Sequence, residues 1–196
     1  MNRTVQEISA SVVILLALAS SHAVAATISG HVSLASKADA GSAVVYLTGD
    51  FHAEPLHNAI VDQRDRTFIP HVSVVTVGTT VRFPNDDTVL HNVFAYFNAK
   101  KFDLGMYPRG QSKPVKFDKP GIVDLLCNIH PDMSAYIMVV DTPYYAVASD
   151  HGQFEIKGVP AGNYTLHAWH ESGQETEQQL TVTDAANVYS IDLHSR

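Results

Sequence analysis

The sequence predicts an all-β protein built from two β-sandwich modules. Few windows place apolar residues at helical spacing, whereas short runs of β-branched and aromatic residues recur between turn clusters. Apolar residues make up 45% and charged residues 17% of the 196-residue chain, a composition that is ordinary for a globular protein with a substantial core. These observations exclude a disordered chain and a helical bundle.

The middle of the chain has the strand rhythm expected of a sandwich or barrel. Residues 72–77 are mostly β-branched and end at Gly78, and residues 79–83 alternate before the turn cluster at 84–87. We expect further central strands at residues 115–117, 122–126 and 135–140. Strands are also expected towards both ends of the chain, at residues 27–34, 43–47, 152–156, 164–169, 177–182 and 188–193.

The first 26 residues read as a secretory signal peptide. Arg3 precedes an uncharged run with an apolar centre at residues 12–18, and small residues follow up to Ala26. We expect cleavage after Ala25 or Ala26. The alternative is an uncleaved membrane anchor, but the apolar centre is short for a span of about 20 residues. We therefore expect an exported protein, periplasmic or secreted, without a stable membrane span.

The charge of the chain argues against nucleic acid as a partner. The formal net charge is −7, and removal of Arg3 and Glu7 with the signal peptide leaves it unchanged. A net acidic protein is repelled by phosphate backbones and by anionic membrane surfaces. No basic stripe with interleaved aromatic residues is present either.

The single cysteine, Cys127, is the residue that most requires an explanation. An exported chain with one cysteine has no internal disulfide, so the thiol is buried and inert, paired between chains, or bound to a ligand. It is followed closely by His130 and Met133, and His91 lies upstream. Two imidazoles, a thiolate and a weak axial thioether form a set that suits copper in both redox states.

The pattern C-x-x-H-x-x-M at residues 127–133, preceded by the pair His91-Asn92, resembles the loops of cupredoxins, the blue copper proteins such as plastocyanin and amicyanin. The resemblance extends over about residues 55–141 and includes the segments at 68–70, 77–83, 102–105 and 117–121. It implies a cupredoxin Greek-key β-sandwich, which we place at residues 51–143, with one mononuclear copper ion per chain.

The resemblance also implies a role for each residue of the motif. His91 and His130 would bind copper through ring nitrogens, Cys127 as the thiolate and Met133 as the weak axial ligand. Asn92 would form a hydrogen bond near the Cys127 sulfur and connect the two ligand loops. In these families the histidine of the short loop, here His130, lies at the surface and passes electrons.

Four further features of the sequence bear on this interpretation. Asp132 places a charge where amicyanin-like loops carry an apolar residue, which puts a hydrophobic docking patch in doubt. We interpret Asp86 and Asp87 as turn residues and not as a general acid and base. His71 follows a proline at a strand start and is expected at the surface, whereas Trp169 is expected in the core.

The remaining segments resemble the carboxypeptidase regulatory-like domains, small sandwiches of transthyretin-like shape. The similarity lies in residues 150–154 and 159–166 and in two strands near the N-terminus, residues 28–32 and 45–47. We therefore hypothesise that the copper module is inserted into this second sandwich, with residues 27–50 pairing with residues 144–196. A simple tandem arrangement of the two modules is the alternative.

These inferences predict a non-enzymatic one-electron carrier that exchanges electrons with redox proteins whose identity the sequence leaves open. Two alternatives use the same ligands: a copper storage or delivery protein, and a small copper enzyme. An enzyme needs an open coordination position, which four protein ligands disfavour. A zinc site and a catalytic Cys-His pair are also conceivable, but structural zinc rarely uses methionine, and no thiol-hydrolase signature is present.

Overall fold

The computed structural model describes residues 25–35, 40–183 and 187–195, and within these ranges every regular element is a β-strand. The predicted all-β class is therefore confirmed. The predicted signal peptide at residues 1–26 lies outside the described residues except for its last two positions. None of the described segments forms a helix long and apolar enough to cross a membrane.

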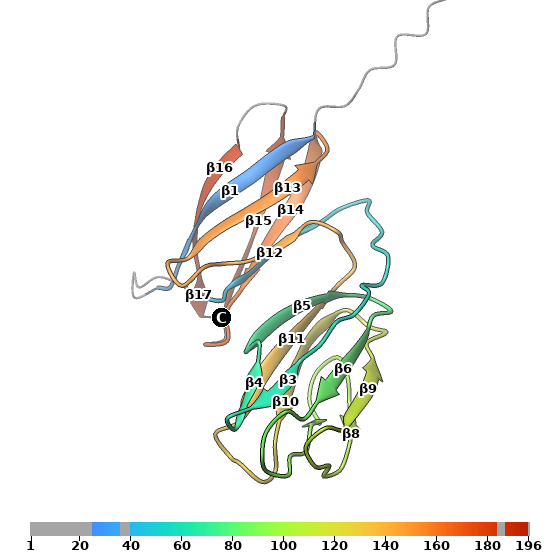
Figure 1. Ribbon diagram of the computed structural model, residues 1–196. Helices are drawn as coiled ribbons and strands as arrows, with labels where there is room; N and C mark the ends of the chain where they lie inside the picture. Colours follow the sequence, from blue (N-terminus) through green and yellow to red (C-terminus); the bar gives the residue numbers. More distant parts are fainter. Residues whose placement is uncertain (1–24, 36–39, 184–186, 196) are drawn as a thin grey trace, which may run out of the picture.

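Strands from both ends of the chain form one sandwich (Figure 1). In its first sheet, β1 (Ala26–Ser33) pairs antiparallel with β13 (Gln153–Val159) and parallel with β16 (Asn187–Asp192). The second sheet has the order β12-β2-β14-β15-β17. The bounds of its strands are β2 Val44–Thr48, β12 Tyr145–Val147, β14 Gly162–Trp169, β15 Gln174–Val182 and β17 His194–Ser195.

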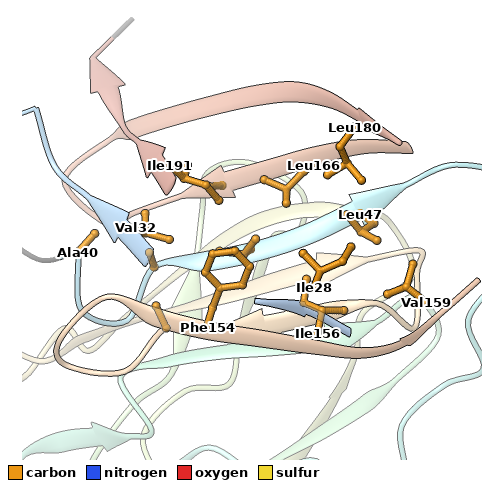
Figure 2. Close-up of a cluster of buried hydrophobic side chains, with 14 of the residues drawn as sticks. Ile28, Val32, Ala40, Leu47, Phe154, Ile156, Val159, Leu166, Leu180 and Ile191 are labelled. Atoms are coloured by element: carbon orange, nitrogen blue, oxygen red, sulfur yellow. The ribbon is translucent and has the colours of Figure 1, made fainter. Parts of the chain in front are cut away.

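The two sheets of this sandwich enclose an aliphatic core. Ile28, Leu47 and Leu166 have no exposed surface, and Figure 2 shows their side chains meeting between the sheets, with Phe154 and Ile156 beside them. This arrangement follows from the alternation along the strands, because successive side chains of a strand point to opposite faces of its sheet. In β13, for example, Phe154 and Ile156 are buried while Glu155 is exposed.

The residues between these strands form the second set of sheets, below the first in Figure 1. One sheet has the order β5-β11-β10-β7-β8, and the pairs β6-β9 and β3-β4 accompany it. The bounds are β3 Asp62–Arg64, β4 Thr67–Ile69, β5 Val72–Thr76, β6 Thr80–Pro84, β7 Phe94–Ala95, β8 Phe102–Asp103, β9 Ser112–Lys116, β10 Gly121–Leu126 and β11 Ser134–Val140.

The core of this second module contains several buried aromatic residues. Phe83, Tyr107 and Phe117 are buried, and Cys127 and Met133 belong to the same cluster. Burial raises the pKa of Tyr107 to about 12. Its hydroxyl therefore keeps its hydrogen and donates it to the carbonyl oxygen of Phe83, 3.0 Å away. Tyr107 thus connects β6 to the segment that carries His91.

A third apolar cluster joins the two modules. Val44 of β2 packs with residues of β5 and β11, including Val72 and Met138. Trp169 was expected in the core, but it is only half-buried and lies at this junction, with its ring 5.4 Å from that of Tyr136 in a T-shaped contact. The cause is the alternation along β14, in which successive side chains point to opposite faces of the sheet. Leu166 and Ala168 point into the sandwich core, so His167 and Trp169 lie on the other face, towards the second module.

Candidate metal centre

A short loop between two paired strands carries three of the predicted ligands. β10 ends at Leu126 and β11 begins at Ser134, and the two strands are antiparallel neighbours. The Cys127 amide donates to the Met133 carbonyl oxygen at 3.2 Å, and the Met133 amide donates to the His130 carbonyl oxygen at 2.9 Å. These bonds close the loop on itself, with Cys127 and Met133 at its stem and His130 nearer its tip.

His91 reaches the same place from a different segment. Its backbone forms an isolated bridge with Tyr107, with the Tyr107 amide donating to the His91 carbonyl oxygen at 2.9 Å. The imidazole has no exposed surface. A fully buried imidazole needs a partner at each ring nitrogen, because an unpaired polar atom in the interior is costly. The surroundings supply both partners.

The Nδ1 atom of His91 faces the loop. It lies 3.1 Å from Nδ1 of His130, and the Cys127 Sγ atom lies 3.9 Å from each of these two nitrogens. The centre of a triangle with these sides is about 2.1 Å from every corner, and first-row metals such as zinc bind imidazole nitrogen and thiolate sulfur at about 2.0–2.3 Å. The spacing of the three donor atoms therefore suits a metal ion.

Met133 is the fourth predicted ligand. Its side chain is 1% exposed and packs in the same cluster as Cys127, while its backbone is bonded to both Cys127 and His130. The loop thus places Met133 at its stem, with its backbone bonded to that of Cys127. Its role as an axial ligand stays a prediction.

The Nε2 atom of His91 faces Asp87, whose Oδ2 lies 2.9 Å away. The hydrogen bond from His91, together with backbone hydrogen bonds from Arg66 and Thr88, holds the pKa of the Asp87 carboxyl well below its usual range, against the opposing effect of burial. The carboxylate accepts the Nε2 hydrogen, so it fixes the tautomer in which Nδ1 is free to bind a metal. Histidines that bind metals commonly have such a partner.

Sequence reasoning missed this role of Asp87. The interpretation as a turn residue accounts for the hydrogen bond from the Thr88 amide to Asp87 Oδ1, but not for the contact with His91. The separation of four residues across a tight turn was the signal that could have found it, since such a turn brings the carboxylate back to the ring. Asp86, the neighbouring acid, is exposed and points away.

Asn92 forms a side-chain hydrogen bond to β8. Its amide nitrogen donates to Asp103 Oδ1 at 3.0 Å, and Asp103 also accepts from the Gly105 amide and the Tyr96 hydroxyl. The Asn92 side chain thereby connects the His91 segment to Asp103, the last residue of β8. Its Oδ1 atom is buried without a hydrogen-bond partner. The predicted contact near the Cys127 sulfur stays a prediction.

Three exposed apolar residues are sequence neighbours of His130, His91 and Tyr107. Ile129 precedes His130, Leu90 precedes His91, and Met106 precedes Tyr107, the bridge partner of His91; the three are 38%, 48% and 62% exposed. Asp132 is exposed in the same loop. The segments that carry His130 and His91 therefore expose both apolar side chains and the carboxylate of Asp132.

The metal-free protein is expected to lose stability on acidification through His130. Burial, followed by the effects of His91 and Arg66, lowers the pKa of His130 below the ordinary value of 6.5. The unfolded chain then takes up this proton at a higher pH than the native protein does, so stability falls as the pH drops below about 6.5. A proton NMR titration should give a midpoint below 6.5, and a midpoint at or above it would contradict the expectation. In His130→Gln this contribution should vanish from the pH dependence of unfolding.

The chain is similar to one protein family and to several solved structures. The family described as "Polysaccharide lyase family 4, domain II" matches residues 135–189, and no curated protein sequence matches the chain. Similar solved structures include a purple cupredoxin from Nitrosopumilus maritimus, with 24% identity and a TM-score of 0.39 over 42% of this chain and all of the other.

Two further solved structures illustrate the range of similar proteins. A copper-containing nitrite reductase from Thermus scotoductus shares 25% identity, with a TM-score of 0.41 over 48% of this chain and a quarter of the reductase. A reduced amicyanin variant shares 23% identity, with a TM-score of 0.39 over 48% of this chain and 99% of the amicyanin. The chain is thus similar to cupredoxins over slightly less than half its length.

Proposed function

We propose that the protein is an exported type 1 copper protein that acts as a one-electron carrier. One mononuclear copper ion would be bound by His91, Cys127, His130 and Met133. The observation that supports this proposal best is the triangle of two Nδ1 atoms and one Sγ atom, whose size suits a transition metal. Bound copper would supply a one-electron couple, Cu(II)/Cu(I).

The protein's own residues would keep the site alike in both redox states. Asp87 holds the ring of His91, and the two backbone bonds of the loop hold Cys127, His130 and Met133 in a fixed relation. Imidazole suits Cu(II), while thiolate and thioether suit Cu(I). A site that changes little on electron transfer has a small reorganisation cost. This combination favours a carrier that exchanges electrons with a protein partner, through the surface around His130.

Storage or delivery of copper without a redox partner is the second candidate. It uses the same ligands, and it differs in that the ion would leave for an acceptor. The observation that favours it is that one short loop, residues 127–133, carries three of the four proposed ligands. Opening of this loop would release most of the coordination sphere at once. A small copper enzyme is less well supported, because four protein ligands leave no open position. We therefore propose a non-enzymatic role.

Export and module boundaries complete the proposal. Ala26 belongs to β1, opposite Val159, and is buried. Cleavage after Ala25 would keep this strand whole, whereas cleavage after Ala26 would shorten it, so we favour the first position.

The strand pairings support a copper module at residues 51–143 inserted in a sandwich of residues 27–50 and 144–196.

Copper binding by Cys127 is tested with the mature protein beside its Cys127→Ser variant. After addition of Cu(II), an intense thiolate-to-copper absorption band and a small copper hyperfine splitting in electron paramagnetic resonance are expected. Both should disappear in the variant, because the serine hydroxyl is not a thiolate. Reductant should bleach the band and oxidant should restore it. A pale spectrum that is the same in both proteins would remove Cys127 from the ligand set.

The same samples separate the carrier from the delivery protein. A carrier should keep its copper through repeated reduction and oxidation, and in the presence of a Cu(I) chelator. Rapid loss of the ion to the chelator in the reduced state would favour delivery.

A further inference from the structure

One histidine outside the predicted ligand set connects the two modules beside the copper loop. His71 lies between β4 and β5, and its Nδ1 atom is 3.0 Å from the carbonyl oxygen of Ser134. Its Nε2 atom is 2.6 Å from Oε2 of Glu171. A carbonyl and a carboxylate both accept hydrogens, so both contacts are hydrogen bonds when each ring nitrogen carries a hydrogen.

The two partners of His71 belong to different parts of the molecule. Glu171 lies in the turn between β14 and β15, in the terminal sandwich. Ser134 is the first residue of β11 and directly follows Met133, the predicted axial ligand. The chain of contacts from Glu171 through His71 to the Ser134 carbonyl therefore runs from one module to the stem of the loop in the other.

A cavity lies beside the stem of the loop on this side. This cavity, of about 440 Å³, separates the stem from β4, and its walls include Ile69, His71, Asp132, Met133 and Ser134. A side chain that borders open space can shift more easily than one in a close-packed core. When both ring nitrogens carry a hydrogen, His71 Nδ1 donates to the Ser134 carbonyl oxygen on this side and restrains the peptide between Ser134 and Ala135.

The ring of His71 is itself held in place. It lies edge-on to Tyr136 at 5.6 Å between centroids, and Tyr136 in turn contacts Trp169 of the sandwich. The backbone carbonyl of His71 also accepts from the Tyr136 amide at 2.8 Å. These contacts fix the position of the ring, and Glu171 then selects the orientation in which Nδ1 points to Ser134.

We propose that Glu171 and His71 are positioning residues by which the terminal sandwich holds the Met133 end of the copper loop. The sandwich would thus adjust the axial ligand of a site in the other module. This inference rests on the proposed copper function for its consequence, but its structural part concerns the loop whether or not copper is bound.

The test compares Glu171→Gln and His71→Phe with Asp141→Asn as a matched control. Asp141 Oδ1 lies 3.2 Å from Nδ1 of His52, so this variant also removes the carboxylate of an exposed His-acid pair, but one without a contact to the loop. His71→Phe retains a ring against Tyr136 and removes both hydrogen bonds. Near-ultraviolet circular dichroism establishes that each variant is folded.

The first readout is amide hydrogen exchange of Cys127 and Met133 in the metal-free protein. Partly exposed ion pairs contribute little, so the exchange should be about two- to five-fold faster in Glu171→Gln and in His71→Phe. Asp141→Asn should leave both rates unchanged. The double variant should match His71→Phe, because Glu171 acts through the ring. Unchanged rates in Glu171→Gln, or an equal increase in Asp141→Asn, would overturn the proposal.

The second readout is the copper-loaded protein. In Glu171→Gln the reduction potential and the rhombicity of the electron paramagnetic resonance spectrum should shift from those of the wild type, and in Asp141→Asn they should not. Equal spectra and potentials in all three proteins would overturn the claim that the axial ligand is adjusted. Failure of copper to give a thiolate band in the wild type would contradict the proposed function alone, since the exchange rates do not depend on it.

Discussion

Asp87→Ala is expected to weaken copper binding by about 10- to 100-fold, the usual cost of losing the partner of a ligand histidine. The carboxylate accepts the Nε2 hydrogen of His91, and the imidazole is completely buried. Without it, the ring can change tautomer or rotate, and Nδ1 no longer faces Cys127 and His130 in a fixed way. Competition with a copper chelator of known affinity measures the effect.

The same variant is expected to destabilise the metal-free protein by about 1–3 kcal/mol, because a buried donor is left unpaired. Asp86→Ala is the matched control, since its side chain is exposed and its nearest cation, Arg64, is 3.6 Å away in solvent. An equal copper affinity of the two variants would show that Asp87 has no role beyond its turn.

Ile28→Ala is expected to lower the free energy of unfolding by about 2–5 kcal/mol, the range for removal of a buried isoleucine side chain beyond Cβ. Ile28 has no exposed surface and meets Leu47, Leu166 and Ile156 between the two sheets (Figure 2). The loss combines the transfer of the removed carbon atoms with the cavity that they leave. Urea unfolding followed by circular dichroism gives the value.

Val188→Ala is the control for this prediction. Val188 lies on β16, in register with Ser29 of β1, but it is 74% exposed. Its substitution should change the stability by less than about 0.5 kcal/mol. A loss below 1 kcal/mol in Ile28→Ala, similar to the control, would mean that β1 contributes little to the sandwich.

Much of the fold was predictable because the strands alternate and end at recognisable turns. The turn at residues 84–87, where β6 ends, followed from local sequence alone, and so did the two strands on either side of the Cys127 loop. The strand β17 and the two-residue strands β7 and β8 were not predicted, because so few residues carry no period. The position of Trp169 at the junction was not predicted, because a half-buried aromatic residue between modules has the same sequence pattern as one in a core.

In the candidate site too, residues close in sequence were predictable and residues in tertiary contact were not. The spacing of Cys127, His130 and Met133 indicated one loop, and the structure brings Cys127 and His130 together with His91. Residues that act through tertiary contacts could not be inferred in this way. Asp103 as the partner of Asn92, and Glu171 as the partner of His71, lie 11 and 100 residues away from them, and no local rule selects them.

The partnership of β1 with β13 and β16 has a consequence for the order of assembly. Ile28 is paired with Ile156, about 130 residues further along the chain, and contacts of such sequence separation close slowly because the loop entropy is lost before the contacts form. Among the described strands, β3 to β11 pair only with one another. Under the proposed export, the module formed by β3 to β11 can therefore fold first, while β1 stays unpaired until nearly the whole chain has crossed.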